Sequence, residues 1–378
     1  MLLSSRRCFI YATVIGAVAI ALGGCTQQVG PALDGTATSS TPCLSPRTEL
    51  AGIYSLSSEE RFSGIPIGGL SAVDYDKRTG HLVLTSDDRG SRGGARAFEA
   101  SFELGDGKAL AVHINGAISL HNSQPLSPAK PVDVEAIRVG RDGMAILASE
   151  GDEVSGTPPG VFKVSLRTGE ATALLLPYLL VPDGQKNHGP RPNRSFEGIS
   201  LTPNEKSYFI SLEAPLAQND LLPSSLNEGA TEIMEVGQNG EIRKRYTYPL
   251  DAIVGAVPGR LSDNGISEIL YLGHGAFLVL ERSGRQQHDG SFLFSNRLYC
   301  ARAVSGQEPL RLEKTLVVDL RGLGVSEQAN FEGMTFVPSP DGQGQMLLLV
   351  SDNDFGSGRD SYFVALKISL KVGRRKPN

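Results

Sequence analysis

The sequence lacks the excess of basic residues that is typical of nucleic-acid-binding proteins. Its 378 residues include 36 Lys and Arg against 41 Asp and Glu, a formal net charge of −5. Loss of the N-terminal segment described below would remove Arg6 and Arg7 and leave 34 basic against 41 acidic residues. Neither balance gives a reason to expect nucleic acid as a partner.

Several motifs of catalytic and metal sites are also missing. No Gly-x-Ser-x-Gly elbow occurs, so a nucleophilic-serine hydrolase of the α/β type has no support. The six histidines show no metal-ligand spacing. The segment Asp352-Asn353-Asp354 alternates oxygen ligands, but it lacks the glycine and the distal Glu of an EF-hand. No sustained helical periodicity follows the N-terminal segment, which argues against a helical fold.

The long apolar run of the chain lies at its N-terminus. Two arginines precede the run Cys8–Leu22, and Leu22-Gly23-Gly24-Cys25 resembles a bacterial lipobox. The run is short for a membrane span. We therefore expect a signal peptide over 1–24 and a diacylated Cys25, so that an exported protein is anchored to the lipid bilayer of the cell envelope without spanning it. Residues 25–47, rich in Gly, Ser, Thr, Pro and Gln, are expected to form a flexible tether.

Cysteine is scarce, with four in the chain. Cys8 leaves with the signal peptide, and Cys25 would carry the lipid. The remaining pair, Cys43 and Cys300, is a candidate disulfide in an exported protein. Two unpaired thiols are the alternative, because Cys43 lies in the tether.

A hairpin with an acidic residue at one or both ends recurs five times, about every 65 residues. The copies run over Gly68–Asp87, Val134–Glu150, Phe196–Glu213, Ser267–Glu281 and Phe331–Asp352. A fixed period of this size indicates a repeat architecture. Each unit can then bury its apolar residues against its neighbours, so that residues 48–370 need no single large core.

Short runs of Val, Ile, Leu, Phe and Tyr separated by turn residues predict β-strands in each unit. Four antiparallel strands per unit, repeated radially, predict an all-β fold, a β-propeller with five motif-bearing blades and five or six blades in total. Ser361–Ile368 supplies a third strand without a fourth, whereas Glu49–Leu56 precedes the first repeat without a unit of its own. The N-terminal strand is therefore expected to complete the C-terminal blade, and a basic tail follows over 371–378.

The acids of these hairpins are predicted to meet at one mouth of the central channel. Residues equidistant from a turn lie opposite each other, which pairs Glu135 with Glu150, Glu197 with Glu213, Glu268 with Glu281 and Glu332 with Asp352. The first hairpin has Gly68 where the others have Glu, which leaves Asp87 alone. About nine carboxylates so close would raise one another's pKa or demand cations. For any single Glu the alternative is a structural role, in which it accepts hydrogen bonds from backbone N–H groups.

These motifs resemble the phytase-like family described as "esterase-like activity of phytase". The residues that carry the resemblance are Gly68–Asp76 with Ser86–Arg89, Asp133–Ile137 with Ala148–Gly151, Asn193–Gly198, Leu280–Arg282, and Asn330–Met334 with Val350–Phe355. The resemblance implies an exported or envelope-anchored propeller that hydrolyses phosphate or carboxylic esters. The Asp-Asp-Pro-Ala segment of calcium-dependent β-propeller phytases is missing, and basic residues are too few for a substrate with six phosphates, so phytate itself is not expected.

The sequence thus predicts a metal-assisted ester hydrolase that acts on phosphomonoesters. Its expected parts are Ca²⁺ ligands (Glu197, Glu213, Glu332 and Asp352), groups that hold substrate oxygens (Arg89, Arg194 and Arg282) and a general base (Glu135 or Glu150). The rival hypothesis is a binding or scaffolding propeller of the cell envelope without catalysis. A sugar- or lactone-acting propeller enzyme is a third.

Overall fold

The structure, a computed structural model, describes residues 44–371 except 90, 106–108, 123–132, 184–186, 220, 305, 341, 343 and 357. The predicted signal peptide, Cys25, Cys43 and the predicted basic tail beyond Lys371 lie outside these residues. The helices described are two short 3₁₀ turns, Tyr178–Leu180 and Leu320–Leu323. None of the helices in this part of the chain is long and apolar enough to cross a membrane.

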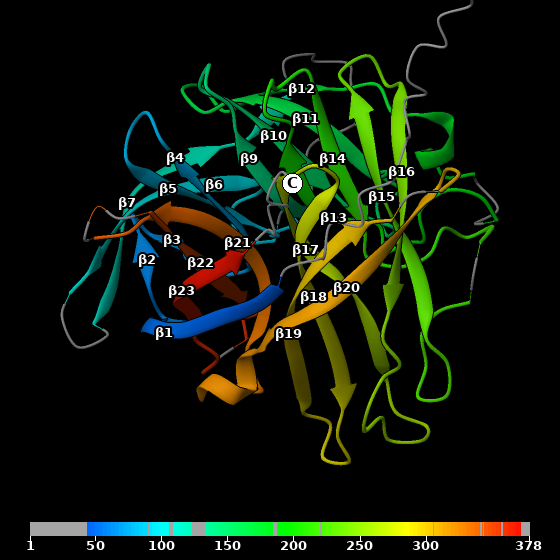
Figure 1. The fold of residues 1–378 in the computed structure, drawn as a ribbon. Coiled ribbons are helices and arrows are strands. Elements are labelled where there is room, and N and C mark those ends of the chain that lie inside the picture. The colour runs from blue at the N-terminus through cyan, green and yellow to red at the C-terminus, as the bar shows by residue number, and fades with distance from the viewer. Residues whose placement is uncertain are drawn as a thin grey trace, which may run out of the picture. The chain divides into compact units, whose positions relative to one another are not determined.

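The strands form five four-stranded units, which we call blades 1 to 5 (Figure 1). Blade 1 holds β4 (Leu70–Asp76), β5 (His81–Ser86), β6 (Arg96–Leu104) and β7 (Leu110–Ser119). Blade 2 holds β9 (Val134–Val139), β10 (Met144–Ser149), β11 (Gly160–Ser165) and β12 (Glu170–Ala173). Blade 3 holds β13 (Phe196–Leu201), β14 (Ser207–Leu212), β15 (Gly229–Gly237) and β16 (Ile242–Leu250). Blade 4 holds β17 (Ser262–Gly273), β18 (Ala276–Gln286), β19 (Phe292–Ala303) and β20 (Leu310–Asp319). Blade 5 holds β21 (Asn330–Pro338), β22 (Gln345–Asp352), β23 (Ser361–Lys371) and β1 (Leu44–Leu56).

Three short strands lie outside the regular pattern: β2 (Arg61–Phe62), β3 (Ile65–Pro66) and β8 (His121–Asn122). The outer strands β16 and β20 pair in parallel over two residues, which joins blades 3 and 4 into one eight-stranded sheet. These additions do not change the four-stranded plan of the blades.

The blades form a closed ring. Each first strand contacts the first strand of the next blade in the order β4, β9, β13, β17, β21, and β21 contacts β4. The N-terminal strand β1 pairs antiparallel with β23, which confirms the predicted closure within blade 5. β1 begins at Leu44, so the folded domain takes in the last four residues of the predicted tether. The fold is a β-propeller, and no sixth four-stranded unit occurs among the described residues.

The hydrophobic core is divided into five clusters, one at each interface between neighbouring blades. Alternate residues of one strand serve the two interfaces on either side of it. In β22, Leu348 packs toward blade 1, whereas Leu347 and Leu349 pack toward blade 4. Both faces of a blade are therefore buried, which is why its strands read as continuous apolar runs.

Candidate acidic site

A β-bulge interrupts each inner hairpin near the start of its first strand. In β21, Phe331 pairs with Ser351 and Gly333 pairs with Val350, so Glu332 is an extra residue. The extra residues of the five blades are Ser71, Glu135, Glu197 with Gly198, Ser267, and Glu332. Because a bulge redirects the side chain of the extra residue, three glutamates turn toward the channel mouth.

The spacing of apolar residues explains these bulges. In every inner strand the residue before the bulge and the residue three positions later belong to the same core cluster; Phe331 and Met334 in β21 are one such pair. A regular strand would place residues three apart on opposite faces. One extra residue between them places both side chains on the core side. The side chain of the extra residue can then enter the channel.

Acids also lie at the ends of the second strands of four hairpins: they directly follow β5, β10 and β14, and Asp352 is the last residue of β22. The backbone N–H groups of Asp87, Glu150 and Glu213 donate to carbonyl groups of the first strand or of the residue before it. Asp352 pairs with Asn330. These acids therefore lie diagonally across from the bulge. Equal distance from the turn had predicted that they lie directly opposite the first-strand acids, and this prediction was wrong.

Blade 4 departs from the predicted pairing of Glu268 with Glu281. Its bulge residue is Ser267, which places Glu268 one step further along β17, and Glu281 pairs with Ile266. Arg282 consequently occupies the position that an acid holds in the other four blades. The sequence prediction was wrong by one residue here, because it assumed a hairpin without a bulge.

The two displaced acids are paired inside the fold and do not line the acidic mouth. Glu281 accepts a hydrogen bond from the hydroxyl of Tyr248 at 2.8 Å and one from Nζ of Lys314 at 2.6 Å. Glu268 lies 2.8 Å from Arg138. Both carboxylates are buried, and each has its own cationic or hydroxyl partner.

The bulge ends of the inner strands enclose a cavity of about 360 Å³, which we call the acidic cavity. Its charged lining residues are Asp87, Glu135, Glu150, Glu197, Glu213, Asp263, Glu332, Asp352 and Asp354, with Arg89, Arg194 and Arg282. All nine residues that the sequence assigned to catalysis, substrate binding or metal binding are among them. The structure therefore brings these residues together, and their individual roles stay predictions.

Sequence reasoning missed six lining residues: Asn193, Asp263, Phe292, Phe294, Asn330 and Asp354. None of them occupies one of the two recurring acidic positions of a hairpin. Asp354 had been noted only as part of a segment of alternating oxygen ligands that lacks the other residues of an EF-hand. Because these six residues lie outside the recurring positions, the period of the repeat carries no signal for them.

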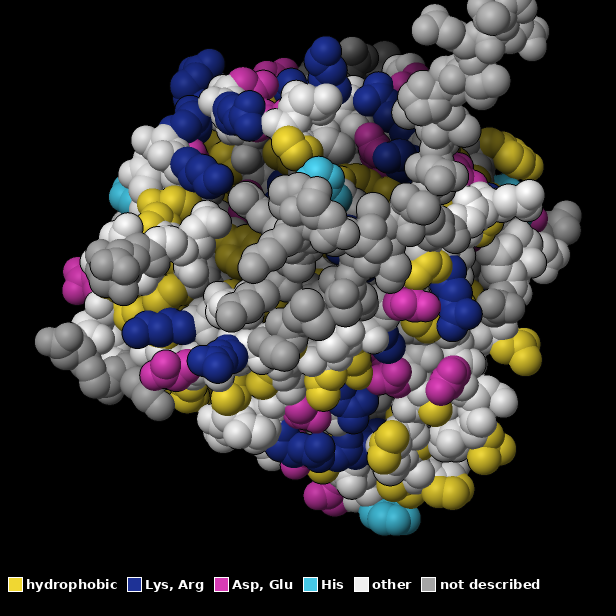
Figure 2. Space-filling model, in the orientation of Figure 1, with side chains coloured by type: hydrophobic (Ala, Val, Ile, Leu, Met, Phe, Trp, Pro, Cys, Tyr) yellow, Lys and Arg dark blue, Asp and Glu magenta, His cyan; other side chains and the backbone are white. Residues whose placement is uncertain are grey.

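The concentration of acids in the cavity contrasts with the surface seen in Figure 2. On the face shown in Figure 2, basic side chains (dark blue) and acidic side chains (magenta) are interspersed. In the cavity, by contrast, nine carboxylates face three guanidinium groups. This excess of six negative groups is compensated by protonation or by bound cations.

Two groups of three buried carboxylates could hold a metal ion, and they share Glu150. One group is Asp133, Glu135 and Glu150; the other is Glu150, Glu197 and Glu213. Within each group the candidate ligand oxygens lie within 4.8 Å of one another. The Oδ1 atom of Asp133 is buried without a hydrogen-bond partner, which is the state of an acceptor that a cation would satisfy. A donor set made only of carboxylates suits a hard divalent cation.

Burial and mutual repulsion raise the pKa values of the cavity acids. Desolvation is the largest cause for Glu135, Glu150 and Glu197, and neighbouring carboxylates raise the pKa further. Burial likewise raises the pKa of Asp87 from 3.8 to about 7 and the pKa of Glu332 from 4.5 to about 8. Without a cation, the cavity retains protons at neutral pH.

The three arginines of the cavity differ in how they are held. Arg282 lies 2.8 Å from Glu213, and Arg89 forms an ion pair with Asp133. The half-buried side chain of Arg194 forms no hydrogen bond or ion pair with the described part of the chain. Arg194 is therefore the guanidinium group most available to an incoming anion.

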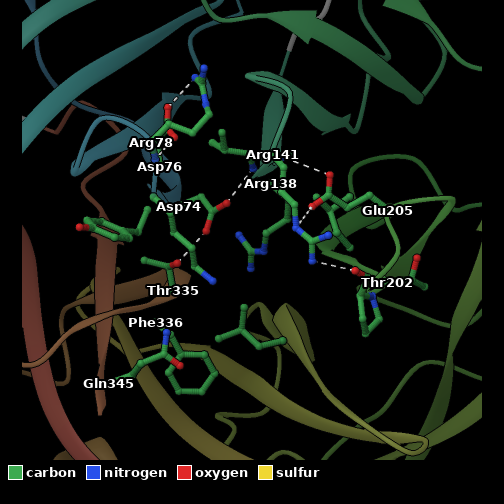
Figure 3. A pocket seen from close by; sticks show the side chains of 17 residues that line it. Asp74, Asp76, Arg78, Arg138, Arg141, Thr202, Glu205, Thr335, Phe336 and Gln345 are labelled. Atoms are coloured by element: carbon green, nitrogen blue, oxygen red, sulfur yellow. Dashed lines mark hydrogen bonds and ion pairs between the residues drawn. The ribbon is translucent and has the colours of Figure 1, made fainter. Parts of the chain in front are cut away.

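A second cavity, of about 380 Å³, lies at the turn end of the inner hairpins (Figure 3). Most of its charges are already paired: Arg78 lies 2.8 Å from Asp76, and Arg141 lies 3.2 Å from Glu205. Asp74 accepts hydrogen bonds from both neighbouring blades. This mouth holds no comparable excess of one charge, so the acidic cavity is the better candidate site.

Cys300 in β19 is buried and takes part in a disulfide bond. Its expected partner, Cys43, lies outside the described residues, so the pairing of these two cysteines stays a prediction.

The phytase-like family, described as "Esterase-like activity of phytase", matches residues 65–355 of the chain. No curated protein matches the chain. Among solved structures, the chain is similar to a thermostable family-43 glycoside hydrolase, with a TM-score of 0.47 and 11% identity over 82% of this chain and 96% of that one. An exo-β-1,3-galactanase from Phanerochaete chrysosporium gives a TM-score of 0.46 and 9% identity over 84% and 63% of the two chains. A mannose phosphorylase from Leishmania mexicana gives a TM-score of 0.39 and 10% identity over 82% of this chain and 86% of that one.

Proposed function

The chain belongs to the phytase-like family, and we propose that it is a metal-assisted hydrolase of phosphomonoesters whose reaction takes place in the acidic cavity. Two clusters of three carboxylates share Glu150, and the guanidinium of Arg194, which forms no hydrogen bond or ion pair with the described residues, lies at the same cavity. This arrangement is the observation that carries the proposal. Clustered carboxylates can hold a cation, and a free guanidinium can hold an anion. A site with both can take a phosphate group.

The metal site is formed in this proposal by the two carboxylate groups: Asp133, Glu135, Glu150, Glu197 and Glu213. Ca²⁺ is the ion we favour, because it takes many carboxylate oxygens in flexible geometry. When bound, the ion would offset the charge of a phosphate and lower the pKa of a water molecule. This assignment exchanges two roles expected from the sequence: Glu135 and Glu150 become ligands, whereas Glu332 and Asp352 lie outside both groups.

Proton transfer falls to Asp87 and Glu332. Burial raises the pKa of both groups toward neutral pH, so each can exchange a proton there. Glu332 accepts a hydrogen bond from Nδ2 of Asn330 at 2.6 Å, which fixes one of its oxygens. Asp87 would act as the base toward water, and Glu332 would donate a proton to the departing alcohol.

The arginines have two different tasks in this arrangement. Arg194 binds the phosphate oxygens, because it lines the cavity and its guanidinium forms no hydrogen bond or ion pair with another described residue. Arg282 and Arg89 hold Glu213 and Asp133 in place through ion pairs. They are positioning residues for the carboxylate groups.

The proposal is tested with the purified chain on p-nitrophenyl phosphate and p-nitrophenyl acetate, each with calcium or with EDTA. We expect calcium-dependent release of nitrophenol from the phosphate ester, and loss of that activity in Glu150→Gln. Glu59→Gln, which changes an exposed acid outside the cavity lining, is the matched control. Cleavage of the acetate alone would make the protein a carboxylic esterase. Turnover of neither ester in any condition would favour the rival function, a binding or scaffolding propeller.

We further propose that lipid on Cys25 anchors the protein to the cell envelope. The support is the sequence Leu22-Gly23-Gly24-Cys25 after an apolar run. In cells fed labelled palmitate, the wild-type chain should carry label in the membrane fraction, and Cys25→Ser should carry none. An unlabelled wild-type chain would contradict the anchor without touching the proposed chemistry.

A further inference from the structure

Blade 4 is extended at the acidic mouth. Strands β18 and β19 have 11 and 12 residues, whereas β5, β10 and β14, which correspond to β18 in the first three blades, have 6 residues each. β18 continues four residues beyond Arg282, which holds the position of the acids that follow β5, β10 and β14, so the β18–β19 hairpin of blade 4 (Figure 1) extends past the ends of these strands. At the start of β19 it carries Phe292 and Phe294, and both line the acidic cavity.

The two phenylalanines form a fixed pair. Residues two apart on a strand lie on the same face, and the ring centroids are 6.2 Å apart with an interplanar angle of 20°. A Cβ atom at Gly284 would lie 3.3 Å from the ring of Phe294, so this ring packs closely against the bare backbone of β18. The N–H group of Phe294 donates to the carbonyl of Glu327 at 2.6 Å.

These rings differ in kind from the rest of the lining. Apart from Phe292 and Phe294, the described lining consists of carboxylates, guanidinium groups and the amides of Asn193 and Asn330. Both phenylalanines are half-buried, so part of each ring remains exposed at the cavity. A stacked aromatic pair on an extended hairpin gives one wall of an otherwise charged cavity the character of an aromatic surface.

We infer that the acidic cavity takes phosphate monoesters of aromatic alcohols, with the phosphate toward Arg194 and the aromatic ring against Phe292 and Phe294. This inference rests on the proposed function and names the substrate class of the same site. Aromatic rings attract one another in offset-stacked and edge-to-face arrangements beyond the effect of burial. Phosphate esters of small polar alcohols gain nothing from such a wall, so the cavity should discriminate against them.

The test measures binding of two phosphonates by calorimetry with the full chain in calcium. Phenylphosphonate and methylphosphonate both carry the anionic group on a P–C bond that ester hydrolysis does not cleave, so catalysis is not needed for the readout. We expect phenylphosphonate to bind about ten-fold or more tightly than methylphosphonate. Phe292→Ala and Phe294→Ala should each reduce this ratio several-fold, because they weaken the binding of phenylphosphonate more than that of methylphosphonate.

Phe102→Ala is the matched control, because Phe102 is a half-buried phenylalanine of blade 1 that does not line the cavity. If an alanine variant does not fold, the corresponding leucine variant keeps an apolar side chain and removes only the aromatic ring. Calcium-dependent thermal stabilisation of each variant confirms that the metal site is intact.

The outcomes separate this inference from the proposed function. Equal affinity of the wild-type chain for both phosphonates would overturn the inference alone. A ratio that survives both substitutions would also overturn it, because the selectivity would then come from elsewhere. If neither phosphonate bound while calcium still did, the phosphate-ester function itself would fail and the inference with it.

Discussion

Glu268 of blade 4 lies 2.8 Å from the guanidinium of Arg138 of blade 2, across the channel that the inner strands surround. The same guanidinium donates to the carbonyl groups of Val73 in blade 1 and Met334 in blade 5, each at 3.2 Å. At the position of Glu268 the other blades have small residues, namely Ala72, Ala136, Gly198 and Gly333. One buried ion pair therefore fills the space between four blades on the inner side of the acidic cavity.

Arg138→Met should destabilise the protein by about 3–5 kcal/mol, because it leaves the buried carboxylate of Glu268 without its counter-ion. Burial already raises the pKa of Glu268 to about 8 although Arg138 opposes the rise. The double variant Arg138→Met/Glu268→Gln should recover part of this loss, since it removes the uncompensated acid. Free energies of unfolding from urea titrations measure both effects.

The control for this cycle is Arg243→Met, which breaks an ion pair between two exposed side chains. Its effect should stay within about 1 kcal/mol. If Arg138→Met cost no more than this control, the channel pair would have no special weight in holding the blades together.

Glu150→Gln should separate a metal-binding role of Glu150 from a structural one. Gln keeps an oxygen that can accept the N–H of Ser195, as Glu150 does at 2.5 Å. It removes one of several buried like charges, so the variant should melt at a higher temperature than the wild type in EDTA at pH 8. Its calcium affinity should fall by about ten-fold or more, since even the loss of an outer partner of a metal costs this much.

Differential scanning fluorimetry and calcium titration provide the two readouts for Glu150→Gln. A purely structural glutamate predicts the reverse pattern, a lower melting temperature in EDTA with the calcium response intact. Glu59→Gln should change neither quantity, because Glu59 is exposed and lies outside both carboxylate groups.

The stability of the calcium-free protein should fall as the pH rises from about 4.5 to about 8. Folding raises the pKa of Glu332 from 4.5 to about 8 and that of Asp87 from 3.8 to about 7, so between these values the folded state holds protons that the unfolded state has released. Each retained proton contributes a slope of about 1.4 kcal/mol per pH unit. The contribution is fully present below pH 4 and is lost above pH 8.

Calcium should reverse this trend, because it binds the deprotonated carboxylates and its affinity rises with pH. Melting temperatures recorded from pH 5 to pH 8.5 in EDTA and in calcium should therefore diverge as the pH increases. A melting temperature in EDTA that rises steadily over this range would contradict the buried acidic cluster as described.

Much of this architecture could be predicted from the sequence, because its signals are local. Alternating apolar runs and turn residues gave the five hairpins, and Glu49–Leu56 lacked a unit of its own, which pointed to closure in blade 5. The register within blade 4 was missed because a bulge changes it by one residue. Ile266 and Ile269 are three apart and both belong to the core between blades 3 and 4. This spacing was the signal that Ser267 is the bulged residue.

The aromatic wall could not be predicted in the same way. Phe292 and Phe294 reach the cavity only because β18 and β19 are longer than their counterparts and fold alongside segments far away in the chain. The contacts of these rings with such segments depend on the position of whole blades, and a single repeat does not encode them. Asp263, by contrast, contacts Arg282 within the β17–β18 hairpin, and it was missed because it lies outside the recurring acidic positions.

Arg194 and Arg282 should respond differently to alanine substitution. Arg194→Ala should lower the melting temperature less than Arg282→Ala does, since the guanidinium of Arg194 forms no hydrogen bond or ion pair with the described residues and acts on Glu213 only through its charge. It should weaken methylphosphonate binding by about 10- to 100-fold, the effect of losing a hydrogen bond to a charged group. Arg194→Lys should restore part of the affinity, because Lys keeps the charge but not the bidentate geometry.

Arg282→Ala should lower the melting temperature, because Glu213 loses the guanidinium that lies 2.8 Å away. Calorimetry and thermal melting on the same samples distinguish the two residues. If Arg194→Ala bound methylphosphonate like the wild type while a folded Arg282→Ala variant did not, Arg282 would be the group that holds the anion.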